Sequence, residues 1–174
     1  MGETFEEMLS GGHHNSLGRT EEVTSLVLAD RGRLEELIDT YSSKDELVRL
    51  RVSGAVKRVT IAHPDWTMDF MDRLQSDVAA IDQASTQWTL ALIFDLTKNL
   101  MNAQQLSRAV DIMKTNLETH PDWIVLNNSM QVLFDWSGDD PELAAWLTPQ
   151  LERLTSETRK SVAGRARKLL AKLA

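Results

Sequence analysis

The sequence predicts an all-α protein, and three observations support this. Apolar residues recur three or four positions apart along nearly the whole chain, and no segment sustains the alternation of apolar and polar residues that is typical of a half-buried strand. Only 8 Gly and 4 Pro occur in 174 residues, which suits helices joined by short turns. A hydrophobic share of 42% with 26% charged residues is that of an ordinary globular protein.

The first predicted helix spans residues 20–30 and begins at Thr20, whose hydroxyl can accept an N–H of the first turn. A short second helix follows at 34–41. The third spans 45–63 and ends there because Pro64 disfavours helical backbone in the residue before it.

Six more helices complete the predicted chain, joined by connections of a few residues that make successive helices antiparallel neighbours. They are expected at 65–76, 85–101, 103–118, 122–136, 140–155 and 158–173. The helix at 140–155 has the clearest start, with Asp140 as cap, Pro141 in the first turn and Glu142 behind it.

Four of these helices share one apolar pattern, at successive offsets of 38, 39 and 37 residues. The aligned positions are Val52, Ala55, Val56, Val59; Leu90, Ile93, Phe94, Thr97; Ser129, Val132, Leu133, Trp136; and Ala166, Leu169, Leu170, Leu173. Thr97 and Ser129 are polar but can lie in a core if each hydroxyl bonds a preceding carbonyl. A period near 38, with one more helix between copies, is typical of stacked helix pairs.

The first copy resembles the second helix of a HEAT repeat, because Asp45 is followed by Val48-Arg49 and then by Ala55-Val56. The resemblance implies a right-handed α-α superhelix, an armadillo-like solenoid of about four helix pairs plus an N-terminal helix. It also implies that Asp45 caps its helix and that Arg49 reaches toward the turn of an adjoining repeat. Asp122 and Val125 occupy the places of Asp45 and Val48 in the third copy, but Leu126 stands in place of the Arg. The resemblance therefore consists of one strong copy and three degenerate ones.

We expect residues 19–174 to form a single helical-repeat domain, preceded by a lead-in at 1–18. The Gly-rich stretch 11–20 is open to three interpretations: a docked capping segment, a partner or anion site, or disorder. It lacks the preceding strand and the Gly-Lys-Ser/Thr ending of a phosphate-binding loop. The lead-in is similar to that of a group of uncharacterised bacterial HEAT-repeat proteins, a resemblance that implies no activity.

The tetrapeptide His-Pro-Asp-Trp occurs twice, at 63–66 and 120–123. Their separation of 57 residues is one and a half periods, so the motif does not mark the repeat. We interpret both copies as one local solution in which proline ends a segment, aspartate caps the next helix and tryptophan covers the joint.

The net charge of −7 is unevenly distributed. The last 16 residues carry six basic and no acidic side chains, so residues 1–158 hold 13 basic and 26 acidic groups. An acidic body disfavours sequence-independent binding to nucleic acid. The acidic start without an apolar run predicts a cytoplasmic protein with no membrane segment.

The sequence contains no recognisable catalytic motif and no set of metal ligands at a typical spacing. With no Cys, thiolate chemistry and disulfides are excluded. His13-His14 lacks further ligands at fixed spacing, and His63 and His120 are expected to be turn residues, so we predict no metal and no cofactor. No nucleophile motif occurs. We therefore expect a protein that is not an enzyme.

The second helices of HEAT pairs usually line the concave face, where such proteins bind their partners. Non-core positions on those helices give the predicted partner-binding residues: Arg51, Lys57, Trp88, Asn127, Asn128, Gln131, Arg165 and Lys168. The hypothesis is a non-enzymatic scaffold that binds a protein or peptide on this face. The sequence does not indicate an oligomeric state.

The alternative hypothesis is an enzyme of another class, because HEAT-like repeats also form DNA glycosylases that act on alkylated bases. Trp88, Asp95, Trp123, Trp136 and the basic last helix could then face a damaged nucleotide, although no motif matches residue by residue.

Overall fold

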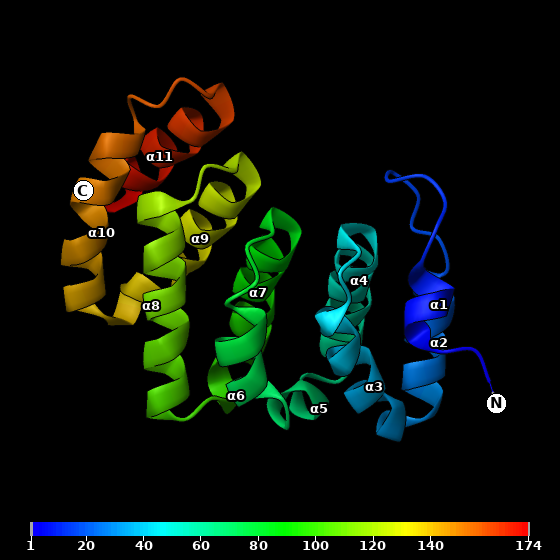
Figure 1. Cartoon of the computed structure of the whole chain (residues 1–174). Coiled ribbons are helices and arrows are strands. Elements are labelled where there is room, and N and C mark those ends of the chain that lie inside the picture. Colours follow the sequence, from blue (N-terminus) through cyan, green and yellow to red (C-terminus); the bar gives the residue numbers. More distant parts are fainter. Residues whose placement is uncertain (1, 174) are drawn as a thin grey trace. The chain divides into compact units, whose positions relative to one another are not determined.

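The computed structural model describes residues 2–173 and confirms the all-α class, since every regular element in that range is helical (Figure 1). Contacts between residues divide the chain into two compact units, Met1–Gln105 and Leu106–Ala174. Within residues 2–173, no helix is both long and apolar enough to cross a membrane.

The first unit contains seven α-helices within the described residues. They are α1 (Phe5–Leu9), α2 (Thr20–Ala29), α3 (Leu34–Asp39), α4 (Glu46–Ala62), α5 (Pro64–Met68), α6 (Met71–Arg73) and α7 (Ala84–Thr97). Short 3₁₀ turns lie at Arg31–Arg33, Thr40–Ser42 and Lys98–Leu100. Helix α1 lies inside the lead-in, where no helix was expected.

Helix α4 forms the centre of the first unit, between α2 and α7 (Figure 1), and it also packs against α1, α3 and α5. Its apolar stripe of Val52, Ala55, Val56 and Val59 is fully buried. Because α4 is packed against other helices on several sides, it is a rigid element, and it fixes the positions of the side chains on its remaining face.

The second unit holds most of α8 (Ala103–Thr119), together with α9 (Trp123–Trp136), α10 (Pro141–Leu154) and α11 (Lys160–Leu173). Helix α11 packs on both α9 and α10. Val162, Ala163, Ala166 and Leu169 are buried in this core, whereas Arg165, Arg167 and Lys168 are exposed.

Fourteen of the sixteen aligned positions are buried, and Leu170 and Leu173 are half-buried. The hydroxyl of Thr97 donates to the carbonyl oxygen of Ile93 at 2.7 Å, which confirms how that polar residue enters the core. The corresponding expectation for Ser129 is wrong, because its buried Oγ has no hydrogen-bond partner in the structure.

The two His-Pro-Asp-Trp turns are not one local solution. In the second, Asp122 caps α9, and its carboxylate accepts the N–H of Ile124 at 2.8 Å. In the first, helix α5 begins at Pro64 itself and Asp65 lies within its first turn. The Trp66 ring stacks on His63 with centroids 4.0 Å apart, while Trp123 is 48% exposed.

The helix expected at 65–76 is also interrupted. Helix α5 ends at Met68, α6 covers three residues, and the chain continues as a π-helix over Leu74–Val78. Met71, Leu74 and Val78 are all buried there, at spacings of three and four that an α-helix would share. Apolar spacing therefore could not distinguish the broken segment from a continuous helix.

Candidate functional site

The lead-in is a folded segment that starts with a capped helix. Thr4 and Glu7 form a reciprocal capping box at the start of α1, and Phe5 and Leu9 are fully buried. Hydrogen bonds from the backbone and side chain of Thr4 lower the pKa of Glu7. The chain then runs through an exposed loop at residues 10–19, which we call the lead-in loop, before α2 begins.

Arg51 on α4 holds this loop. Its side chain is buried, and the residue is 3% exposed. Nη1 donates to the carbonyl oxygens of Leu9 and Gly11, both at 2.6 Å. Nη2 donates to the carbonyl oxygens of His13 and Ser16 at 3.3 and 3.1 Å, and Nε donates to the carbonyl oxygen of Ser16 at 3.2 Å.

All five N–H groups of the Arg51 guanidinium are thus occupied by backbone carbonyls of the lead-in loop and of the end of α1. No carboxylate of the described residues pairs with it. The consequence is a buried positive charge that is fully hydrogen-bonded but not neutralised by an anion.

Beside Arg51 lies a pocket of about 290 Å³, which we call the α4–α7 pocket. The lead-in loop forms one wall, and α4 and α7 form the others. Its lining residues are His14, Asn15, Ser16, Leu17, Thr20, Leu50, Arg51, Gly54, Lys57, Arg58, Trp88 and Thr89. Three of the predicted partner-binding residues, Arg51, Lys57 and Trp88, are therefore brought together here.

The charge of the α4–α7 pocket is opposite to that of its unit. Residues 1–105 carry 17 acidic and 10 basic side chains, yet the described lining includes three cations and no carboxylate. A concave site lined by charges of one sign concentrates the electrostatic field and attracts ions of the opposite sign.

Gly54 leaves space for the Arg58 side chain, although glycine weakens the middle of a helix. Arg58 turns back along α4, and its Nη1 donates to the Gly54 carbonyl oxygen at 2.8 Å. A Cβ on Gly54 would lie 3.2 Å from that nitrogen and 3.5 Å from the methyl group of Thr20. The missing side chain thus lets Arg58 lie against the pocket wall.

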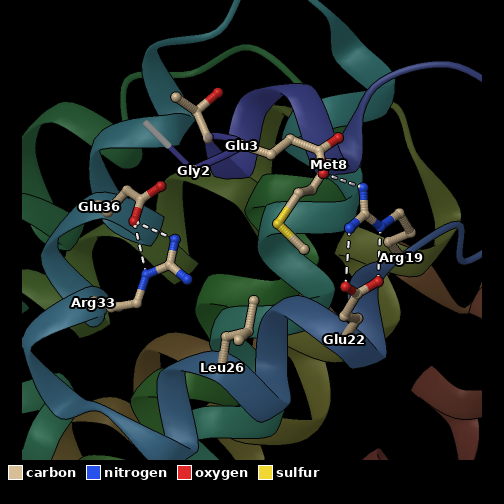
Figure 2. A pocket seen from close by; sticks show the side chains of 9 residues that line it. Gly2, Glu3, Met8, Arg19, Glu22, Leu26, Arg33 and Glu36 are labelled. Carbon is tan, nitrogen blue, oxygen red and sulfur yellow. Dashed lines mark hydrogen bonds and ion pairs between the residues drawn. The ribbon is translucent and has the colours of Figure 1, made fainter.

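A second hollow, of about 480 Å³, lies beside α1 and contrasts with this pocket (Figure 2). Figure 2 shows Arg19 between Glu3 and Glu22, at 2.6 and 2.7 Å, and Arg33 directed at Glu36, at 2.8 Å. Hydrogen bonds from Arg19 lower the pKa of Glu22. Its three carboxylates and two guanidiniums are all paired within the chain, so the hollow anchors the lead-in and leaves no charged side chain of its described lining without a partner.

The structural residues of the HEAT resemblance lie at the starts of helices. Asp45 is the N-cap of α4, and its carboxylate accepts the N–H of Leu47 at 2.8 Å. Nε of Arg49 donates to Oε1 of Gln83 at 2.7 Å. Nε2 of Gln83 in turn donates to the carbonyl oxygen of Glu46. Since Gln83 is the N-cap residue of α7, these bonds tie the starts of α4 and α7 together.

The other predicted partner-binding residues belong to the second unit. Gln131 on α9 and Arg165 on α11 contact each other, with Nη1 of Arg165 donating to Oε1 of Gln131 at 2.9 Å. Asn127 is 6% exposed, and its Oδ1 has no hydrogen-bond partner in the structure. Asn128 is half-buried and Lys168 is exposed.

Within residues 2–173, no group of three or more His, Asp or Glu side chains is placed to hold a metal ion. No protein-family model matches the chain, and no curated protein matches it. The resemblance to HEAT repeats thus rests on the residue pattern alone.

Arg58 and Leu50 were not predicted to belong to a site. A partner or anion site was one interpretation of residues 11–20, but their contact with α4 and α7 was not predicted. The Thr4-x-x-Glu7 capping box was a usable signal for α1. Nothing comparable marked the return of the loop onto α4, because the bonds of Arg51 join residues 35 to 42 positions apart.

Proposed function

We propose that the chain is a non-enzymatic binding module built from stacked helix pairs of the HEAT type, in a right-handed superhelix, which binds a segment of a protein partner. The period near 38 and the burial of its aligned positions support the repeat. A binding role suits such repeats because stacked pairs build an extended concave surface.

The α4–α7 pocket is the observation that carries this proposal. The pocket is concave and combines an aromatic side chain with cations. It brings Arg51 and Lys57 of α4 together with Trp88 of α7. Aromatic residues and arginine are the side chains most enriched among those that dominate binding energy. A volume of about 290 Å³ is large enough for one side chain of a partner.

The glycosylase alternative shares Trp88 with this pocket, but the other aromatic residues and the basic helix assigned to it belong to the second unit. One of the aromatic residues assigned to it, Trp136, is 5% exposed and belongs to the buried face of α9. A base can stack only on an aromatic face that it can reach. A gel-shift on duplex DNA at low salt tests the alternative directly, and we expect no retarded band.

The test of the proposal is selection of a random peptide library displayed on phage against the intact protein. We expect enriched peptides that bind the wild type and lose binding to the Trp88→Ala variant. Trp123→Ala is the matched control, because Trp123 is an exposed tryptophan of the second unit. Trp88→Phe and thermal unfolding of each variant separate lost contacts from lost folding. The proposal fails if no peptide enriches, or if all enriched peptides bind Trp88→Ala as tightly as the wild type.

A further inference from the structure

We infer that the α4–α7 pocket binds the carboxylate side chain of an acidic residue that is followed or preceded by an apolar residue in a partner peptide. The inference rests on the proposed function and names the ligand class of the same site. Three features carry it: the unneutralised charge of Arg51, the available donors of Lys57 and Arg58, and the apolar surface around them.

Arg51 contributes positive electrostatic potential to the pocket but no hydrogen bond to a ligand. Its five N–H groups are occupied by carbonyls, so a ligand gains no hydrogen bond from it. Its positive charge nevertheless lies buried at the pocket wall without a carboxylate partner among the described residues. A charge in such surroundings is poorly screened and favours an anion nearby.

Lys57 and Arg58 supply the hydrogen bonds. Lys57 has no hydrogen-bond or ion-pair partner within residues 2–173, so its three N–H groups are available. Arg58 donates to Gly54 from one nitrogen, which leaves its other N–H groups for a ligand. A carboxylate between an ammonium and a guanidinium forms charge-assisted bonds, about twice as strong as neutral ones.

The composition of the pocket favours a carboxylate over a phosphate group. A dianionic phosphate is best held by several free guanidinium forks or backbone N–H groups. Here the Arg51 fork is fully used, which leaves one ammonium and one partly occupied guanidinium. These donors match a singly charged group with two oxygens.

The apolar part of the ligand is indicated by the residues around the cations. Leu17, Leu50 and Trp88 line the pocket. Ile61 is 61% exposed and lies one helical turn beyond Lys57, on the same face of α4. An acidic residue bound at Lys57 would therefore place a neighbouring apolar residue against Ile61 or Trp88.

The test is titration of the ¹⁵N-labelled full chain with an acetylated, amidated Gly-Ser host peptide that contains one Glu-Leu pair. A peptide with Gln-Leu is the isosteric control. We expect the Glu-Leu peptide to shift amide resonances at residues 14–17, 50–58 and 88–89, and to bind roughly tenfold more tightly than the Gln-Leu peptide. Equal binding of the two peptides overturns the inference.

Variants assign the carboxylate to its donors. Lys57→Gln is expected to weaken Glu-Leu binding roughly tenfold, whereas Lys57→Arg retains most of it. Lys44→Gln is the matched control, because Lys44 is exposed and lines none of the hollows described. Gly54→Ala keeps every charge but displaces Arg58, and should weaken binding without loss of folding. If Lys57→Gln and Lys44→Gln have equal effects, the assignment is wrong.

Two further peptides distinguish the source and type of the anion. A Gly-Ser peptide with a free C-terminal carboxylate and no Glu should bind more weakly than the Glu-Leu peptide, and the reverse order overturns the choice of a side-chain carboxylate. Tighter binding of a phosphoserine-Leu peptide overturns the choice of carboxylate over phosphate. Phage-selected peptides that depend on Trp88 but lack acidic residues would refute this inference and leave the proposed function intact.

Discussion

The guanidinium of Arg51 lies against the Cα of Gly18, so close that a side chain at position 18 would collide with it. An ideal Cβ on Gly18 would lie 2.8 Å from Cζ of Arg51 and 3.0 Å from Nε. Gly18 also has a φ of +52°, in the left-handed region that favours glycine. The last turn of the lead-in loop is therefore shaped around the cation that holds it.

Gly18→Ala should release the lead-in loop. The new methyl group would collide with a buried guanidinium that five hydrogen bonds hold in place, and the left-handed backbone conformation adds strain. Together these effects should destabilise the docked loop by about 1–3 kcal/mol. We expect faster hydrogen exchange and proteolysis at residues 10–19, with α4 and α7 still protected. Gly138→Ala is the control, because nothing lies within 4 Å of a Cβ at Gly138. Unchanged exchange in the loop of Gly18→Ala would show that the contact with Arg51 does not hold it.

Arg51→Lys tests the fork geometry while it keeps the charge. An ammonium offers three N–H groups from one point and cannot serve four carbonyl oxygens spread along the loop. We expect a loss of about 1–3 kcal/mol in the free energy of unfolding, measured with urea. Arg31→Lys, at an exposed position, should change it by less than about 0.5 kcal/mol. Equal losses for the two variants would contradict the role given to Arg51.

Tyr41 makes the alkaline behaviour of the first unit measurable, because it is the single tyrosine in the chain. Burial raises its pKa far above the usual value of 10.0, although the hydrogen bond with Ser53 opposes the shift. Tyrosinate absorbance at 295 nm should therefore stay absent in the folded protein above pH 10 and develop only with unfolding.

The same shift predicts how stability depends on pH. Above pH 10 the unfolded state releases the phenol proton while the folded state keeps it, so the stabilisation is complete below pH 10 and is lost as the pH rises. The loss amounts to about 1.4 kcal/mol per pH unit from this group. Tyr41→Phe should remove that slope in urea titrations at alkaline pH. If the dependence of the free energy of unfolding on pH were the same in Tyr41→Phe as in the wild type, the phenol of Tyr41 would be exposed to solvent.

The two His-Pro-Asp-Trp turns show what local sequence can and cannot fix. The same four residues begin α5 at Pro64 in one place and cap α9 through Asp122 in the other. The two turns differ in their long-range contacts: Arg31 lies over the Trp66 ring, with its Cζ 5.8 Å from the ring centroid, whereas Arg159 donates to the carbonyl oxygen of Pro121. Local sequence predicts a break between helices and leaves its geometry undecided.

Periodicity predicted the core well for a physical reason. A position such as Val56 or Phe94 is buried whatever its exact neighbours are, because the stripe of one helix must face another element. Arg51 illustrates the opposite case. It lies on α4 among buried positions, and what it binds depends on where a distant loop returns. The cationic pocket follows from that return and so was not predictable from spacing.

Glu157 gives the second unit a predicted acid sensitivity. It forms an ion pair with Arg159, with Nη2 and Oε2 2.9 Å apart, and accepts bonds from Thr158. These bonds, the one from Arg159 foremost, lower the pKa of Glu157 to about 2 from 4.5. Because the folded state holds the charged form more strongly, the stabilisation is complete above pH 4.5 and is lost as the pH falls toward 2.

Glu157→Gln should therefore lower the Tm at pH 7, with a difference from wild type that shrinks below pH 4.5 and vanishes near pH 2. Arg159 also donates to the carbonyl oxygen of Pro121, so the ion pair fixes the residues before α11 against the turn before α9. Glu152→Gln is the matched control, since Glu152 is exposed and has no ion pair within residues 2–173. A difference in Tm that persists at pH 2 would mean that packing, and not charge, is what the substitution removes.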